Sequence, residues 1–154
     1  MTRTNLSALY KTDFHAWTLT VTELIRQRQF TELNLEDLAE ELADLGKKER
    51  YELANRLVIL LAHLLKWQFQ PIQRSSSWRG SINEQRTQIA RHLKHNPSLE
   101  PYIPEAIIDA YPDAVKLAAA DSGLPERIFP TECSYTIVQI IDNQFYPPAN
   151  AGAP

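Results

Sequence analysis

The chain has 154 residues, a mass of 17.7 kDa and a formal net charge of −3, which together predict one domain and favour neither a nucleic-acid nor a membrane partner. Apolar residues make up 44% and charged residues 23%, which is ordinary for a globular protein. The single cysteine, Cys133, excludes an internal disulfide and is typical of a cytoplasmic protein, and no apolar run reaches the ~18 residues of a membrane span.

The N-terminal part of the chain predicts two helices, each with one apolar face. In the first, which follows Thr12 as N-cap, apolar residues recur at spacings of three and four: Phe14, Trp17, Val21, Leu24 and Ile25. The second begins after the N-cap Asn34 and carries a stripe of leucines: Leu35, Leu38, Leu42 and Leu45. Gly46 is predicted to weaken or end that helix, because glycine is a poor helix former and a common C-cap.

The third predicted helix, from Lys47 to Gln70, is the most apolar part of the chain. Between Leu57 and Leu65 it is apolar almost all round, which is typical of a buried central helix. Pro71 ends it, because proline lacks a backbone donor and clashes with the preceding turn.

The rest of the chain predicts helices over 78–95, 104–122, 125–129 and 136–142. The second of these is kinked or split at Pro112 and closed by Gly123. We therefore predict an all-α fold, a single compact helical bundle of about five to seven helices around the central helix. The domain is predicted to span 1–147, and residues 148–154 to form a disordered C-terminal tail.

Two ionisable side chains fall on apolar helix faces, where an unpaired charge is costly. His63 lies within the central helix, and Arg86 follows Ile82 by four positions. Arg86 needs a carboxylate or several carbonyls there, and we predict Glu41 as its partner, with His63 nearby. The trio is interpreted either as a core-specifying hydrogen-bonded network or as a site of general acid–base chemistry, with His63 and Glu41 as weak catalytic candidates.

Residues 63–95 form a basic block, with six Lys or Arg against the single Glu84. This block is interpreted as charge pairing inside the fold or as a surface that binds an anion or nucleic acid. The candidate binding residues are Lys66, Trp67, Arg74, Trp78, Arg79 and Arg86. His92 and His95 have a spacing that a metal could use, but histidine is favoured electrostatically at a helix end, and we predict no metal and no cofactor.

Five segments carry a resemblance to a known family: TDFHAW, LNLEDLAEELADLGKKER, LLAHLLKWQFQP, SWRGSINEQRTQIARHL and LPERIFPTECSYTIVQIID. In this order, over about Leu9 to Pro147, the chain resembles the bacterial domain-of-unknown-function family numbered 29. The resemblance implies a small all-α domain and assigns no activity to it. The positions that match the family pattern are Glu41, Gly46, His63, Lys66, Trp67, Trp78, Arg79 and Arg86. Pro112 departs from that pattern.

Three functions follow as hypotheses. The helical composition and the lack of a catalytic signature favour a non-catalytic protein-interaction module, which binds a protein partner or a second copy of itself. The first alternative is a nucleic-acid-associated protein that uses the basic 63–95 block, with binding that weakens steeply with salt. The second alternative is a small enzyme with a His63/Glu41 site, which requires both side chains to be reachable by a small molecule.

Overall fold

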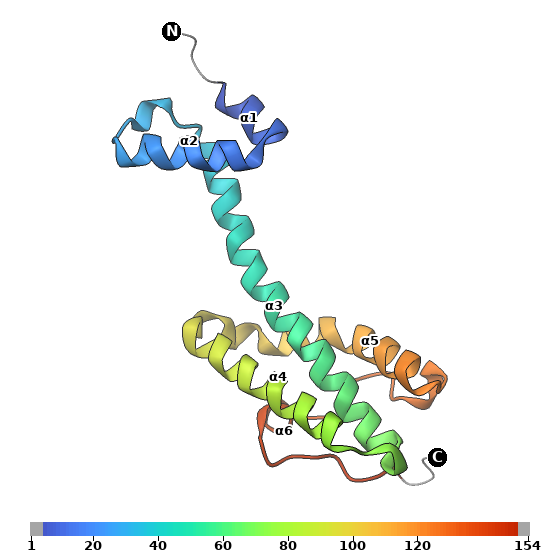
Figure 1. The fold of residues 1–154 in the computed structure, drawn as a ribbon. Coiled ribbons are helices and arrows are strands. Elements are labelled where there is room, and N and C mark those ends of the chain that lie inside the picture. The colour runs from blue at the N-terminus through green and yellow to red at the C-terminus, as the bar shows by residue number, and fades with distance from the viewer. Residues whose placement is uncertain (1–4, 151–154) are drawn as a thin grey trace. The chain divides into compact units, whose positions relative to one another are not determined.

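The computed structural model describes residues 5–150, and these form helices and connecting segments without a strand (Figure 1). The α-helices are α1 (Leu6–Thr12), α2 (Phe14–Arg26), α3 (Leu35–Phe69), α4 (Ser76–His95), α5 (Ile103–Ser122) and α6 (Ile137–Ile141). Short 3₁₀-helices cover Phe30–Glu32, Pro71–Gln73, Pro97–Tyr102 and Glu126–Ile128. The predicted all-α fold of about five to seven helices around a long central helix is confirmed.

Contacts between residues divide the chain into two compact units, Met1–Lys48 and Glu49–Pro154. The helix α3 begins in the first unit and continues through the second, so its 35 residues belong to both. Helices α1 and α2 belong to the first unit, and α4, α5 and α6 belong to the second. Each unit has an apolar core of its own.

The central helix α3 runs without a break through Gly46, where the sequence predicts an end. A glycine closes a helix when it adopts the left-handed conformation, as Gly123 does after α5 with φ 74°. Gly46 stays helical and costs α3 about 1 kcal/mol relative to alanine, which the helix formers on both sides offset. The boundary predicted at Gly46 is therefore wrong, and the central helix begins at Leu35 instead of Lys47.

Two other predicted helix details differ from the structure. The N-cap of α2 is Asp13, whose carboxylate accepts a hydrogen bond from the backbone nitrogen of Ala16 at 3.0 Å, whereas Thr12 is the last residue of α1. Helix α5 continues through Pro112, so it is not split there. The proline removes one backbone donor, and the neighbouring Tyr111 and Ala114 are buried in the core on either side of it, so packing keeps this helix whole.

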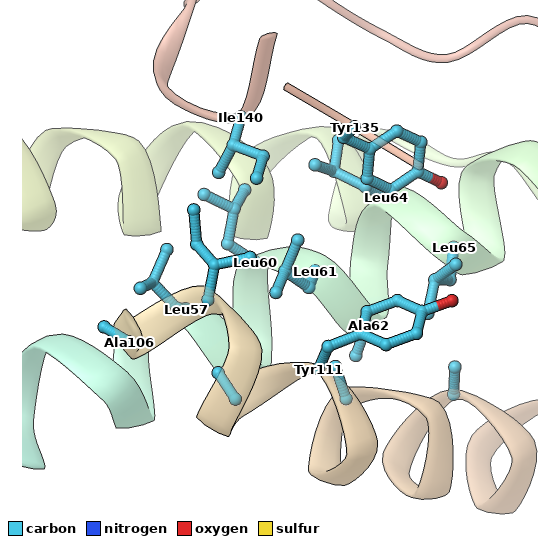
Figure 2. Close-up of a cluster of buried hydrophobic side chains, with 14 of the residues drawn as sticks. Leu57, Leu60, Leu61, Ala62, Leu64, Leu65, Ala106, Tyr111, Tyr135 and Ile140 are labelled. Atoms are coloured by element: carbon cyan, nitrogen blue, oxygen red, sulfur yellow. The ribbon is translucent and has the colours of Figure 1, made fainter. Parts of the chain in front are cut away.

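The core of the second unit surrounds the second part of α3. Figure 2 shows α3 leucines such as Leu57 and Leu60 between side chains of α5, including Ala106, and Ile140 of α6. The fully buried leucines are Leu53, Leu57, Leu60, Leu61, Leu64 and Leu65. Helix α5 presents an alanine every four residues to this core, namely Ala106, Ala110, Ala114 and Ala118. Small side chains in one row let two helix axes approach closely, and each leucine so buried contributes about 1.5–3 kcal/mol.

The C-terminal segment after α6 packs onto the second unit. Pro147 is fully buried, and the backbone nitrogen of Asn150 donates to the carbonyl of Gln68 at 2.9 Å. Residues 151–154 of the predicted tail lie outside the described residues. The structure thus places residues 143–150 along the end of α3, where they contribute to the site described below.

The first unit has a small core. Leu6, Trp17 and Val21 are its buried residues, and Leu38 of α3 packs against them. The rings of Tyr10 and Trp17 lie 4.8 Å apart. None of the described helices combines the length and the apolar character that crossing a bilayer requires.

Candidate functional site

The second unit gathers three arginines around two aromatic rings. We call this group the arginine cluster; it consists of Arg74, Arg79, Arg86, Trp67 and Tyr146. The guanidinium carbon of Arg79 lies 5.2 Å from the ring centre of Trp67 and 4.9 Å from that of Tyr146. Arg74 lies 5.0 Å from the Trp67 ring, and Arg86 lies 5.6 Å from the Tyr146 ring. Four of the six predicted binding residues are therefore neighbours.

Local structure at the end of α3 positions these side chains. Trp67 occupies the last turn of α3, and the 3₁₀-helix Pro71–Gln73 then turns the chain back. The hydroxyl of Ser75 then caps α4 by accepting from the backbone nitrogen of Trp78 at 3.2 Å. This turn brings Arg74 and the first two turns of α4 beside Trp67.

Arg86 is the most buried member of the cluster, at 2% exposed. Its Nε donates to the carbonyl of Ile140 at 2.8 Å, and its second terminal nitrogen donates to the carbonyl of Gln139 at 3.2 Å. The remaining terminal nitrogen is buried without a hydrogen-bond partner among the described residues. Burial lowers the pKa of Arg86, while the nearby Tyr146 and Asp142 act in the opposite direction.

The predicted pairing of Arg86 with Glu41 is not the one that the structure forms. Glu41 belongs to the first unit, where its carboxylate accepts a hydrogen bond from the hydroxyl of Tyr10. That hydrogen bond is the main cause of a raised pKa at Tyr10, with burial second. Arg86 instead donates to backbone carbonyls. These were the alternative to a carboxylate that the sequence predicts for a buried arginine.

Arg74 and Arg79 differ in their contacts: Arg74 donates hydrogen bonds to backbone carbonyls, whereas Arg79 lies against aromatic rings. The Nε of Arg74 donates to the carbonyl of Trp67 at 2.8 Å, and a terminal nitrogen donates to the carbonyl of Pro147 at 3.3 Å. Arg74 thereby holds the C-terminal segment on the end of α3. Arg79 is exposed and its contacts are the two aromatic faces. No carboxylate among residues 5–150 forms an ion pair with any arginine of the cluster.

Lys66 and Trp78 form a second group. The ammonium of Lys66 lies 5.1 Å from the ring centre of Trp78 and 3.0 Å from a carboxylate oxygen of Asp121. The side chain of Lys66 is 6% exposed and that of Asp121 is 43% exposed. This charge is therefore paired inside the fold, which agrees with charge pairing as one interpretation of the basic block.

His63 lies one helical turn before Lys66 and is half-buried. Its Nδ1 donates to the carbonyl of Ile59 at 2.8 Å, four residues earlier on α3. Burial lowers the pKa of His63; Lys66 also lowers it, while the Ile59 hydrogen bond and Asp121 raise it. His63 and Glu41 have different partners in different units, so the acid–base pairing of these two residues stays a prediction.

His63 lines neither of two hollows in the described surface. One, of about 570 Å³, lies in the first unit between the chain around Leu6 and the start of α3, from Asn34 to Glu36. The other, of about 620 Å³, is lined by residues at the end of α4, including Arg91 and Lys94.

His92 lies among acidic groups, whereas His95 does not. The Nε2 of His92 donates to the backbone carbonyl of Glu49 at 2.9 Å, and its Nδ1 lies 3.7 Å from the carboxylate of Glu52. The ligand atoms of these three residues lie within 4.8 Å of one another, which suits a cation in spacing. Arg56 already supplies a positive charge there, since it pairs with Glu52 at 3.1 Å.

Sequence reasoning missed two residues of these groups, Tyr146 and Asp121. Tyr146 precedes two prolines in a segment whose composition indicated a tail, and its ring lies 4.9 Å from that of Trp67. Asp121 stands at the end of α5, and only the packing of α5 against α3 brings it to Lys66. A residue before proline prefers extended backbone, which was a weak sign that Tyr146 is ordered. Nothing in the sequence indicated the position of Asp121.

Part of the first unit's apolar surface is exposed. On α3, Leu35 is 65%, Leu42 61% and Leu45 52% exposed. The other large apolar residues exposed in this unit are Phe14, Leu19, Ile25 and Phe30. Of the leucine stripe that the sequence predicts on this helix, only Leu38 packs against the small core of the first unit.

The chain belongs to the family described as "Domain of unknown function DUF29", whose model matches residues 9–146. This confirms the family resemblance over nearly the whole chain. No curated protein and no solved structure matches it.

Proposed function

We propose that this member of the DUF29 family is a non-catalytic protein-interaction module that binds through the exposed apolar side chains of its first unit. One observation supports the proposal above the others. Within residues 5–48, seven large apolar side chains are between 41% and 65% exposed, while only Leu6, Trp17 and Val21 of this unit are buried.

Such a surface is costly for a unit that acts alone. Removing apolar surface from water contributes about 25 cal/mol per Å², and a unit this small has little core with which to offset the exposure. Exposed apolar patches on otherwise polar surfaces are typical of protein-binding sites. The row Leu35, Leu42 and Leu45 offers the anchors that a helix of a partner would cover.

The nucleic-acid alternative has less support. Of the predicted cations, Lys66 pairs with Asp121. Arg74 donates to the backbone carbonyls of Trp67 and Pro147, and Arg86 donates to carbonyls of α6. Arg79 is the exposed cation of the arginine cluster, and phosphate binding gains strength from several such charges. The enzyme alternative has no observation in its favour beyond the presence of His63.

A cytoplasmic, bacterial setting remains part of the proposal. The single cysteine, Cys133, is half-buried, and burial raises the pKa of its thiol. A raised pKa makes the reactive thiolate scarce, so nothing about this residue calls for an oxidising compartment.

Site-specific photo-crosslinking in cells of the source tests the proposal. A photoreactive residue in place of Leu42 should give a discrete protein adduct. The matched control replaces Lys48, which is also exposed and lies about 120° away round α3. An adduct from position 42 that is absent from position 48 and is lost when Leu35 is changed to Glu supports the proposal. No adduct, or equal adducts from both positions, overturns it.

A further inference from the structure

The exposed side of α3 in the first unit carries a regular seam of large and small residues. Leu35, Ala39, Leu42 and Gly46 follow one another at spacings of four, three and four, and all four are exposed. At 100° per residue they lie within about 60° of one another on the helix. Spacings of four and three are those of a helix that pairs with another helix along its length. We call these four residues the α3 seam.

Gly46 has no function within its own chain that explains a glycine. Its φ is not positive, and a Cβ added to it would meet nothing within 4 Å. A glycine inside a helix nevertheless costs about 1 kcal/mol relative to alanine. The lack of a side chain here matters only to something that approaches α3 from outside, since glycine lets another backbone or a large side chain come close.

From these observations, and resting on the proposed function, we propose that the α3 seam binds the α3 seam of a second copy of this chain, with the two helices antiparallel. In one register, centred between Glu40 and Glu41, Leu35 of one copy faces Gly46 of the other, and Ala39 faces Leu42. Each large side chain thus meets a small one in every layer. A parallel pair would place Gly46 opposite Gly46 and Leu42 opposite Leu42, which leaves a gap beside a clash.

The charges beside the seam fit the same register. Glu36 and Lys47 are exposed and lie on the same flank of α3, about 90–110° from the centre of the seam. In the antiparallel register Glu36 of one copy comes within about 3 Å, along the helix axis, of Lys47 of the other. Twofold symmetry forms this pair twice. The present contact of Lys47 with Asp44 is long, at 3.9 Å, and exposed, so Lys47 can exchange partners at little cost.

Sedimentation velocity on the purified full chain tests the proposal. The wild type is expected to shift with concentration from 17.7 kDa towards twice that mass. The change Gly46→Leu should raise the dimer dissociation constant at least tenfold, because the added side chain blocks the place of Leu35. At concentrations where the wild type is also monomeric, the same change should leave the helical circular dichroism and the unfolding midpoint unchanged or higher, since leucine favours helix.

Charge exchange tests the register. Glu36→Lys and Lys47→Glu should each weaken the dimer, and the two together should restore it, because the exchanged charges still meet across the twofold axis. The control Lys48→Glu carries the same charge change about 150° from the centre of the seam and should leave the dimer intact.

Three outcomes would contradict parts of the proposal. If the wild type stays monomeric up to the order of 1 mM, a second copy of the chain is not the partner of the α3 seam. The proposed function then still stands if position 42 crosslinks a different protein. A dimer that tolerates Gly46→Leu overturns the seam, and a dimer that the double charge exchange fails to restore overturns the antiparallel register.

Discussion

The Nε of Arg86 donates to the backbone carbonyl of Ile140, 2.8 Å away and 54 positions later in the sequence. Ile140 and Gln139 lie in the last turn of α6, where carbonyls have no partner within their own helix. The guanidinium of Arg86 satisfies both carbonyls and places a positive charge at the negative end of that helix. A buried cation thus fixes α6 on the core of the second unit.

We expect Arg86→Met to lower the free energy of unfolding by about 3 kcal/mol, because a hydrogen bond to a charged group contributes ~1.5–3 and two carbonyls lose their donor. Arg86→Lys should recover only part of this, since an ammonium lacks the planar fork that reaches both carbonyls. Urea unfolding followed by tryptophan fluorescence measures the difference. Arg91→Met, on an exposed part of the same helix, is the control. A loss below about 1 kcal/mol for Arg86→Met would show that these bonds contribute no more than an average neutral one.

The burial of Arg86 follows from its sequence position, but its partner does not. Its place between Ile82 and Ile89 puts it on a buried stripe, and both isoleucines are indeed buried. The acceptors are backbone carbonyls, which every residue has, so no side chain marks them in the sequence. Glu41 was the carboxylate that helical spacing favoured, and it bonds to Tyr10 instead. The residue that a side chain contacts far along the chain depends on how the helices pack. The spacing of apolar residues within one helix does not predict that packing.

The same limit applies to the leucine stripe of α3. Periodicity correctly predicts a helix with Leu35, Leu38, Leu42 and Leu45 on one side, because the period reports local structure. It does not report what covers that side, and only Leu38 of the four packs against the core of the first unit. Conversely, the run from Leu57 to Leu65 is apolar on almost every side, so it must be buried to leave water. The prediction of a central buried helix is confirmed there.

Asp121→Asn should destabilise the second unit more than Lys66→Met does. Removing the carboxylate leaves the ammonium of Lys66 buried without its counter-charge, which costs about 1–3 kcal/mol when the partner is half-exposed. Replacing the lysine by methionine keeps its apolar stem and removes the buried charge. The carboxylate of Asp121 that remains is half-exposed and can be hydrated, so this change leaves no buried unpaired charge. Unfolding of the two single variants and the double variant in urea gives the order. If Lys66→Met proves the worse of the two, the ion pair outweighs its desolvation and the argument fails.

Tyr146→Leu should cost about 1–3 kcal/mol, because the ring contacts Trp67 and lies under the guanidinium groups of Arg79 and Arg86. Tyr146→Phe is the matched control. It keeps the ring and loses only the exposed hydrogen bond to Asn83, so a cost below about 1 kcal/mol is expected. Limited proteolysis provides a second readout. If the C-terminal segment, residues 143–150, loosens from the core, a protease should cleave within it more rapidly. Equal costs for both variants would mean that the hydroxyl, rather than the ring, holds the segment.

The burial of His63 predicts a pH dependence with a definite sign. Its pKa in the folded chain is lower than the ordinary 6.5, chiefly through burial, so between the two values the unfolded chain binds more protons than the folded one. The free energy of unfolding therefore rises with pH in that window, and it falls as pH is lowered from 6.5 through the folded pKa. Burial and the neighbouring charge of Lys66 act in the same direction.

We expect the wild type to lose more stability than His63→Gln when urea unfolding at pH 7.5 is compared with that at pH 5, because the variant has no proton to take up at this position. Imidazole resonances in a pH titration by NMR check the cause directly, since the folded-state midpoint of His63 should lie below 6.5. Parallel pH profiles for wild type and variant, or a midpoint at or above that value, would show that the hydrogen bond to Ile59 and the charge of Asp121 outweigh burial. His63 would then become protonated within the fold without a loss of stability, which would strengthen it as an acid–base candidate.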